Sequence, residues 1–357
     1  MTATHDDRWW EGLGARTVRV DIDEARRASV RVLVSYAVPR SDAEITARHL
    51  VEGSVRGYPA HGLERLPQLV AMLHRGTLNP APRRTVVRRS SALAVLDGDH
   101  GLGPPAAAEA VALGRSMARS CGVGVVGLRA AGHQGALGPW AEQCAGDDCF
   151  GLVVSASEPG VVAGQGTRPI FGTNPIAYAW PTGQGPVVAD FSTAATTRSE
   201  LLRRAETGDP LPPGTAVDGH GRPTRDARAA LEGGLLPLRG DHKGVLLSLL
   251  AGMLAGPVVD GPAPHQVAGT RKPDTPPDKA DFFLVINLGA TTDMSVFQAR
   301  SEALREVLAC PDAGSFVLPG KRARRRSAAA RREGLNVSPA VARLLGTETS
   351  QWQETRP

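Results

Sequence analysis

The stretch Gly122-Val123-Gly124-Val125-Val126-Gly127 decides which fold class the sequence predicts, because its letters satisfy the dinucleotide-binding pattern Gly-x-Gly-x-x-Gly. In that pattern the glycines end a strand and begin a helix, so that pyrophosphate lies at the helix N-terminus. Here the order is reversed, since the stretch follows a helical pattern over 106–119 and runs into an apolar strand pattern over 123–128. Glycines that end a helix and begin a strand explain this order better. The sequence therefore argues against a Rossmann domain.

Predicted helices and strands alternate on both sides of this stretch. Helical spacing covers 18–57, with Asp21 or Asp23 as a cap, and two short strands at 84–89 and 92–97 form a predicted hairpin. The other predicted elements are strands at 150–155, 176–180, 187–191 and 282–288, and helices at 139–145, 199–205, 245–254 and 295–308. This pattern predicts an α/β fold of mixed α+β character, interrupted by a proline-rich loop over 256–280.

Composition narrows the class of protein. The chain of 357 residues is 41% apolar and 22% charged, which is typical of a globular protein with a sizeable core. The first ten residues lack a basic segment followed by an apolar one, so no signal peptide is predicted, and no window of the sequence is expected to contain the ~18–20 apolar residues that a membrane span needs. The four cysteines form no Cys-x-x-Cys pair, so we expect a cytoplasmic protein without a metal site.

The net charge of +5 raises the question of a nucleic-acid partner. Arginine is dense over 321–332, and such a run can bind phosphates. No aromatic residues alternate with these arginines, although aromatic side chains are what single-stranded nucleic acids stack on. A solvated helix face is the favoured interpretation.

Residues 60–67, Ala-His-Gly-Leu-Glu-Arg-Leu-Pro, place His61 four residues before Arg65 ahead of an apolar-periodic run. Arginine binds a carboxylate with its planar fork, and a neighbouring histidine can exchange a proton near neutral pH. The alternative is that His61 packs in a loop and Arg65 makes a surface ion pair. The local sequence does not exclude that alternative.

Several loops share one composition, in which small residues surround one or two polar side chains. They are 60–65, 131–135, 172–175, 190–193 and 240–244. Small residues let a cofactor approach the backbone closely. Polar side chains in these loops could bind phosphates, hydroxyls or a carboxamide, namely Asn174, Asp190, Ser192, His242 and Lys243.

The order of these motifs resembles the malate/L-lactate dehydrogenase family, which includes sulfolactate and ureidoglycolate dehydrogenases and cyclic-ketimine reductases. The resemblance covers about residues 17–347. The motifs that carry it are His61-Gly62 with 65–67, 96–99 with 101–103, 132–133 with 135–136, 172–177, 188–191, 236–244 and 318–320.

The resemblance implies a role for each matching residue. His133 matches the histidine that donates and accepts the proton, His61 a second histidine that reaches the substrate, and Arg65 the arginine that binds its carboxylate. The residues that match cofactor-lining segments are Thr173, Asn174, Asp190, Ser192, His242, Lys243 and Gly244. The implied cofactor is NADPH or NADH.

The resemblance also implies the architecture and the partners. We expect a non-Rossmann NAD(P)-binding domain with a mixed sheet at 91–255, inserted into a helix-rich second domain for substrate binding and dimerisation. Residues 1–90 would form the helix-rich N-terminal part of that second domain, and residues 281–357 a C-terminal part that returns to the other domains. The implied partners are a small 2-oxo acid or cyclic imino acid and a second copy of the chain, with neither nucleic acid nor membrane.

Departures from the family pattern surround the expected substrate. Ala60 replaces the usual serine, and Gly132 and Gln134 flank His133 where asparagine and an aromatic are common. Val245-Leu246 also stands where an aromatic and a glycine are expected. We interpret these changes as altered specificity. The expected reaction is hydride transfer between NAD(P)H and C2 of a 2-oxo or 2-hydroxy acid. One alternative is reduction of a cyclic ketimine such as piperideine- or pyrroline-2-carboxylate. The other is that the chain is a degenerate member of the family, which binds a nucleotide without turnover.

Overall fold

The structure is a computed structural model that describes residues 17–164, 166–270, 273–310, 317–346 and 352–353. The first ten residues, for which no signal peptide is predicted, therefore lie outside the described residues.

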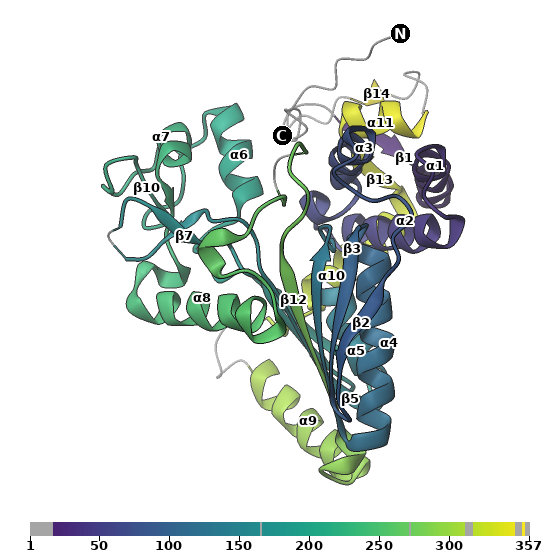
Figure 1. The fold of residues 1–357 in the computed structure, drawn as a ribbon. Coiled ribbons are helices and arrows are strands. Elements are labelled where there is room, and N and C mark those ends of the chain that lie inside the picture. The colour runs from purple at the N-terminus through teal and green to yellow at the C-terminus, as the bar shows by residue number, and fades with distance from the viewer. Residues whose placement is uncertain (1–16, 165, 271–272, 311–316, 347–351, 354–357) are drawn as a thin grey trace.

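A seven-stranded mixed sheet forms the centre of the molecule (Figure 1), in the order β2-β3-β4-β12-β5-β8-β9. β3 and β4 are parallel, and the other neighbouring pairs are antiparallel. The strands are β2 (Thr85–Arg89), β3 (Leu93–Gly101), β4 (Val123–Ala131), β5 (Cys149–Ser155), β8 (Ile176–Trp180), β9 (Val187–Phe191) and β12 (Ala280–Asn287). This order differs from the parallel order of a Rossmann domain, and the predicted mixed α/β class is confirmed.

The glycines at 122–127 serve the turn from helix to strand. Gly122 ends α4 (Gly103–Cys121) in a left-handed conformation with φ of 82°. Gly124 lies in β4, where an added Cβ would be 2.1 Å from the carbonyl oxygen of Gly114. The helix can therefore pack directly on the strand backbone, and the stretch is not a phosphate-binding turn.

Two apolar layers cover the faces of the central sheet. On one face α4 and α5 (Gly138–Ala145) pack against strand residues such as Phe283. On the other face Phe282 packs with Ala251 of α8 (His242–Leu254). Successive residues of β12 therefore face opposite cores, as strand geometry requires.

The helix-rich part of the fold combines both ends of the chain. Its helices are α1 (Ile22–Ser35), α2 (Arg40–Val55), α3 (Leu66–Arg75) and α11 (Pro339–Leu345), and its sheet has the order β13-β1-β14. These strands are β1 (Thr17–Val20), β13 (Leu335–Val337) and β14 (Trp352–Gln353). One core contains Leu33 and Leu69 from the first part of the chain and Val341 from the last.

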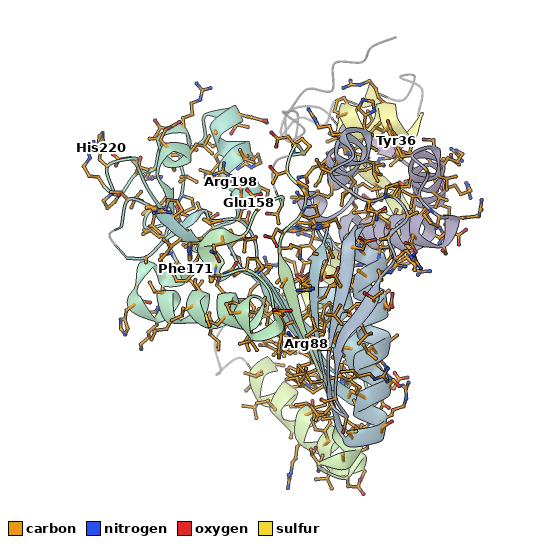
Figure 2. All side chains as sticks on the ribbon, in the orientation of Figure 1. Tyr36, Arg88, Glu158, Phe171, Arg198 and His220 are labelled. Carbon is orange, nitrogen blue, oxygen red and sulfur yellow. The ribbon has the colours of Figure 1, made fainter. Side chains whose placement is uncertain are left out.

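A smaller lobe lies beside the central sheet (Figure 1). Its four-stranded sheet has the order β10-β11-β6-β7, and Phe171 of β7 belongs to its core (Figure 2). Its elements are β6 (Val161–Val162), β7 (Pro169–Phe171), α6 (Arg198–Thr207), β10 (Ala216–Val217), α7 (Ala227–Glu232), β11 (Gly234–Leu235) and η3 (Leu238–Gly240).

The proline-rich segment forms 3₁₀ turns and packs on the rest of the fold. Glu158, which follows β5 (Figure 2), accepts a 2.7 Å hydrogen bond from the backbone N–H of Thr270. The Thr270 hydroxyl in turn accepts a bond from the Glu158 N–H at 3.2 Å. The turns around this region are η4 (Pro257–Val259), η5 (Pro264–Gln266) and η6 (Leu288–Ala290).

Two helices remain. α9 (Met294–Ala309) is amphipathic, and α10 (Lys321–Glu333) is strongly basic. α10 contains the arginine-rich stretch, and none of its side chains is fully buried. Arg326 donates to the Gly57 carbonyl at 3.0 Å, and Arg324 donates to the Pro186 carbonyl at 2.8 Å. The helix therefore lies on the surface, and two of its arginines attach it to the segment just after α2 and to the segment just before β9.

Three details of the expected elements were wrong. The first residues of the expected helical region form β1, because Val18 and Val20 alternate inward in a strand. The strands of the smaller lobe were missed, since most are only two residues long and lie among glycines. The helix expected from 245 begins at His242, because Asp241 caps it by accepting the Gly244 N–H at 3.1 Å.

The expectation that nothing resembles a membrane span also needs a correction. Among the described residues, His242–Val259 is one segment long and apolar enough for a span, with mean hydropathy 1.5 and 39% of it buried. The expectation was wrong because the mean hydropathy of this window stays high although the window includes the polar Ser248 and the break at Gly256. In this structure the break separates α8 from η4.

Candidate active site

His61 and His133 lie with their rings face to face. His61 ends the 3₁₀ turn η1 (Pro59–His61), and His133 follows the end of β4. The ring centroids are 5.2 Å apart and the ring planes differ by 14°. The fold thus brings together two histidines that the sequence separates.

Close backbone packing against α2 positions His61. A Cβ on Gly53 of α2 would lie 2.8 Å from the His61 carbonyl oxygen, and the Ser54 hydroxyl accepts the Leu63 N–H at 2.9 Å. A larger residue at Gly53 would push the turn away. Because Gly53 has no side chain, the turn that contains His61 can pack directly on the backbone of α2.

A backbone hydrogen bond orients the ring of His133. The N–H of Gly135 donates to Nδ1 of His133 at 2.9 Å, and Gly135 has a positive φ of 81°. Because Nδ1 accepts this bond, the proton of a neutral ring lies on Nε2. His133 therefore has an N–H to offer on the side of the ring away from Gly135.

Arg65 is buried beside this pair, with only 7% of its surface exposed. It ends η2 (Leu63–Arg65), donates from Nε to the Ala60 carbonyl at 3.2 Å, and donates from NH1 to Oε1 of Gln68 at 2.6 Å. Burial lowers the pKa of Arg65 to about 10, so it stays positively charged at neutral pH. A buried guanidinium favours binding of an anion.

Burial also determines the charge of the histidines. It lowers the pKa of His61 to about 4, with a further contribution from Arg65. It lowers the pKa of His133 well below its ordinary value, and the nearby charges of Arg65, His61, Lys279 and His49 add to the effect. Both rings are therefore neutral at pH 7. A substrate carboxylate on Arg65 would offset part of that positive field.

A buried ion pair, which sequence reasoning missed, lies at the start of β12. Lys279 is 2% exposed and pairs with Asp281, which is fully buried. Ser155 donates to Asp281 and accepts from Nζ of Lys279 at 3.2 Å. The signal was present in the sequence, since two charged residues two positions apart at the start of an apolar strand share one face.

Three of the residues expected to line the cofactor lie together. Asn174 accepts the Ser157 N–H at 3.2 Å, and the Ser192 hydroxyl donates to the Thr173 carbonyl at 3.0 Å. The amide of Asn174 also reaches the Ser248 carbonyl of α8 at 3.5 Å. This polar cluster joins the smaller lobe to the central sheet.

The other expected cofactor residues occupy two different places. His242 and Lys243 are exposed in the first turn of α8, and Gly244 is buried against the Leu238 carbonyl. Asp190 contacts a different element, because it accepts the Gly138 N–H at 2.7 Å at the start of α5. Burial raises the pKa of Asp190 to about 6.

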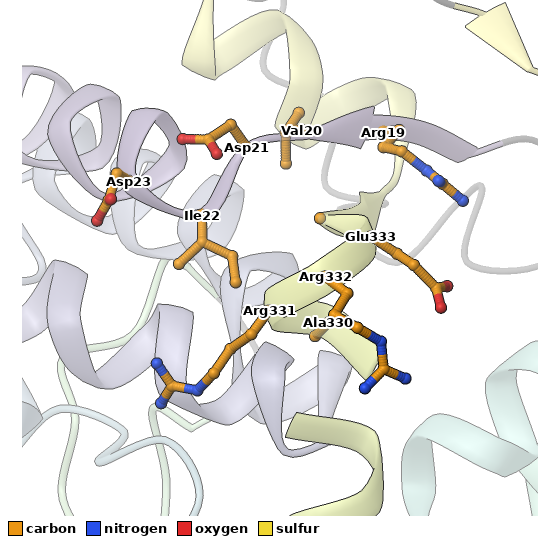
Figure 3. A pocket seen from close by; sticks show the side chains of 10 residues that line it. Arg19, Val20, Asp21, Ile22, Asp23, Ala330, Arg331, Arg332 and Glu333 are labelled. Atoms are coloured by element: carbon orange, nitrogen blue, oxygen red, sulfur yellow. The ribbon is translucent and has the colours of Figure 1, made fainter. Parts of the chain in front are cut away.

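A surface hollow of about 500 Å³ lies away from these residues (Figure 3). It is formed where β1 and the start of α1 meet the end of α10, and its lining includes Asp21, Asp23, Arg331 and Arg332. Neither His61 nor His133 lines it. We therefore build the candidate site on the histidines and not on this hollow.

Comparison with known proteins identifies the family of the chain. Residues 20–345 match the family model described as malate/L-lactate dehydrogenase. The chain belongs to that family. The resemblance inferred from the motifs is thereby confirmed.

Relatives in this family are similar to the chain over most of its length. L-sulfolactate dehydrogenase of Methanothermobacter thermautotrophicus is 32% identical over 92% of this chain and 96% of its own. The structure of sulfolactate dehydrogenase from Methanocaldococcus jannaschii has a TM-score of 0.86 at 32% identity, covering 92% of this chain and 95% of that one. Delta(1)-pyrroline-2-carboxylate reductase 2 of Burkholderia multivorans is 32% identical over 68% of this chain and 71% of its own.

Membership of the malate/L-lactate dehydrogenase family makes the protein an oxidoreductase. Its reaction is hydride transfer between a nicotinamide cofactor and a 2-oxo or 2-hydroxy acid. The residues at the start of α8 fit such a cofactor, because Lys243 and His242 are exposed in a helix first turn, where negative phosphates are favoured.

Proposed function

We propose that the protein reduces the C2 carbonyl of a 2-oxo acid at the site formed by His61, His133 and Arg65. The observation that carries the proposal is the stacked histidine pair beside a buried arginine. This arrangement combines a group that can bind a carboxylate with an N–H donor that can face the neighbouring carbonyl oxygen. The nicotinamide cofactor supplies the hydride when it is bound.

Arg65 binds the substrate carboxylate in this proposal. Its buried guanidinium is held through Gln68 and Ala60, so its orientation is fixed before substrate arrives. Fixed orientation lowers the entropic cost of placing the substrate.

His133 serves the carbonyl oxygen. Hydride arrival at C2 builds negative charge on that oxygen, and the Nε2–H of His133 stabilises this charge and passes its proton to the oxygen. Because the ring starts neutral, a proton from solvent returns to it in the same step, so that no imidazolate is left. The resting position of the proton suits reduction, because oxidation of the alcohol needs a free electron pair at the same nitrogen. His61, stacked on the other ring, contacts the substrate from a second side.

Two groups of residues hold the cofactor, NADPH or NADH. Thr173, Asn174 and Ser192 supply hydrogen-bonding groups between the smaller lobe and the central sheet. His242 and Lys243, which are exposed in the first turn of α8, face the phosphates. Gly244, whose N–H is bonded to Asp241, lets this turn pack closely against Leu238. Asp190 acts indirectly, through the start of α5, and so supports the loop that contains His133.

A second candidate function is reduction of a cyclic ketimine such as pyrroline- or piperideine-2-carboxylate. The similarity to the Burkholderia reductase favours it, as does a TM-score of 0.83 at 29% identity to delta1-piperideine-2-carboxylate reductase from Pseudomonas syringae, which covers 92% of this chain and 98% of that one. Such substrates also have a carboxylate beside the reducible carbon. Arg65 would serve both classes.

The test measures oxidation of NADPH and of NADH with a panel of 2-oxo acids and cyclic imines. The wild-type protein should turn over at least one class, and His133→Ala should lower kcat by roughly 10²- to 10⁴-fold. The exposed His220→Ala is the matched control for the loss of a histidine. Absence of turnover with intact cofactor binding would identify a degenerate member, and unchanged kcat in His133→Ala would refute the site.

We also propose the remaining arrangement implied by the family resemblance. The domain limits are those given above, except that the cofactor-binding part, built on the central sheet, also takes in β2 (Thr85–Arg89) and β12 (Ala280–Asn287). The protein acts in the cytoplasm, which the four free cysteines Cys121, Cys144, Cys149 and Cys310 support, since thiols persist in reducing compartments. We also propose that two copies of the chain form a homodimer.

A further inference from the structure

His49 of α2 is a buried histidine to which the proposed reaction gives no role. Its side chain is 3% exposed, and its ring stacks on Trp140 with centroids 4.1 Å apart and planes 10° apart. Among the described residues Nε2 of His49 has no hydrogen-bond partner. Burying an unpartnered nitrogen costs stability, so this residue needs an explanation.

The ring lies directly against the loop that contains His133. A Cβ added to Gly135 would be 2.5 Å from Cδ2 and 2.6 Å from Nε2 of His49. The ring also donates a hydrogen bond to the backbone of Ala136. Its stacking partner Trp140 donates from Nε1 to the Gln134 carbonyl at 3.0 Å. Three consecutive loop residues therefore rest on the His49–Trp140 pair.

The middle residue of those three is the one that orients His133. Gly135 donates its N–H to Nδ1 of His133, and the opposite side of Gly135 faces the ring of His49. Since Gly135 has no side chain, its backbone is located only by what packs against it. A change at His49 is thus transmitted to His133 through one residue.

We propose that His49 is a positioning residue for His133: by supporting Gly135 and binding Ala136, it keeps the Gly135 N–H on Nδ1 of His133 and the proton of the neutral ring on Nε2. The proposal rests on the proposed function of His133. A purely packing role would not require histidine, because phenylalanine could stack on Trp140 without burying an unpartnered nitrogen.

The experiment compares two variants by ¹⁵N NMR of the histidine rings and by steady-state kinetics. His49→Phe keeps an aromatic ring on Trp140 but loses the bond to Ala136, whereas His49→Asn keeps a donor for Ala136 but loses the stack. Spectra at pH 7.5 report which nitrogen of His133 carries the proton. A His133→Gln protein identifies the His133 signals by their absence.

We expect His49→Phe to remain folded, to shift the His133 proton toward Nδ1, and to lower kcat about 10- to 100-fold with little change in KM, as a displacement near 1 Å would. His49→Asn should retain more of the Nε2–H form and more of kcat. Wild-type His133 signals and kcat in His49→Phe would overturn the proposal, as would equal losses in both variants that follow their thermal stability.

The spectra separate this inference from the proposed function, because they do not depend on turnover. A tautomer change in His49→Phe, in a protein that turns over none of the tested substrates, would support the positioning role and refute the proposed reaction. If His49→Phe does not fold, His49→Asn provides the test. This variant keeps a donor for the Ala136 backbone, so a mixture of the two His133 tautomers in it would contradict the role given to that hydrogen bond.

Discussion

Arg65 is the residue at which substrate binding and chemistry can be separated. Arg65→Lys keeps a positive charge but loses the planar fork, so the substrate carboxylate should be held by fewer hydrogen bonds. We expect KM for the acid substrate to rise by roughly 10- to 100-fold, the effect of about 1.5–3 kcal/mol from one lost charged hydrogen bond. Arg40→Lys provides the exposed control, and an unchanged KM in Arg65→Lys would remove Arg65 from the carboxylate site.

The buried histidines also make stability depend on pH. The pKa of His49 falls to about 3 and that of His61 to about 4 because of burial, whereas both titrate near 6.5 when unfolded. The unfolded chain therefore binds more protons below pH 6.5, and the free energy of unfolding should fall as pH falls from 7 toward 4. His49 alone should account for about 2 kcal/mol of loss by pH 5.

The measurement is urea unfolding between pH 7.5 and 5, with His49→Phe as the matched variant. Comparison with the variant is needed because the raised pKa of Asp190 acts in the opposite direction over part of this range. The wild type should lose more stability than His49→Phe as the pH falls. Parallel curves would show that His49 is not held neutral by burial.

Sequence reasoning named candidate site residues where the chemistry of the local sequence was visible. His61 and Arg65 stand close together in the chain, and glycines flank His133, so each suggested a functional loop. Lys279 and His49 gave weaker signals, because one begins a strand and the other occupies an ordinary helical position. Their importance depends on contacts across the sheet and between α2 and the 132–137 loop, which periodicity does not encode.

At the scale of elements, the free energy of unfolding should depend on the buried ion pair between Lys279 and Asp281 at the start of β12. Lys279→Met would leave Asp281 buried without its cation, which typically costs about 3–5 kcal/mol. The double variant Lys279→Met with Asp281→Leu removes both charges and should recover much of that loss. Chemical unfolding of the three proteins tests this, and an additive loss in the double variant would contradict a coupled pair.

Elements with a strong period or a clear boundary were the ones predicted best. β8 and β9 agree with their expected limits, since apolar residues there end at polar turns. The short strands of the smaller lobe were not predictable, because two residues have no measurable period and acquire strand geometry only from their partners. β1 was mistaken for helix for the same reason, since its pairing with β13 comes from the other end of the chain.

At the scale of the whole molecule, the architecture depends on packing between segments from the two ends of the chain. The core around Leu33 and Val341 joins segments that are far apart in sequence, and β12 enters the central sheet between β4 and β5 after the proline-rich segment. The helix-rich part and the central sheet are therefore both discontinuous in sequence. Such long-range pairing could be inferred from the family resemblance but not from local composition.

The exposed apolar face of α8 bears on the proposed homodimer. Leu246 and Leu250 are 59% and 54% exposed, and Leu249 and Met253 on the same helix are also exposed. Patches of this kind on a protein surface mark contact sites, and a symmetric pair of such helices could bury each other. Because α8 begins with His242 and Lys243, a dimer through this face would also fix the helix that we propose to bind the cofactor.

Leu246→Glu combined with Leu250→Glu should therefore convert a dimer into a monomer and raise KM for the cofactor, while Val307→Glu on the exposed face of α9 serves as the control. Light scattering after size exclusion gives the mass, and cofactor titration gives the binding. A wild-type protein that is monomeric, or a variant that stays dimeric with unchanged KM, would refute this interface. Binding of the wild type to lipid vesicles, lost in the variant, would instead assign the apolar face to a membrane surface.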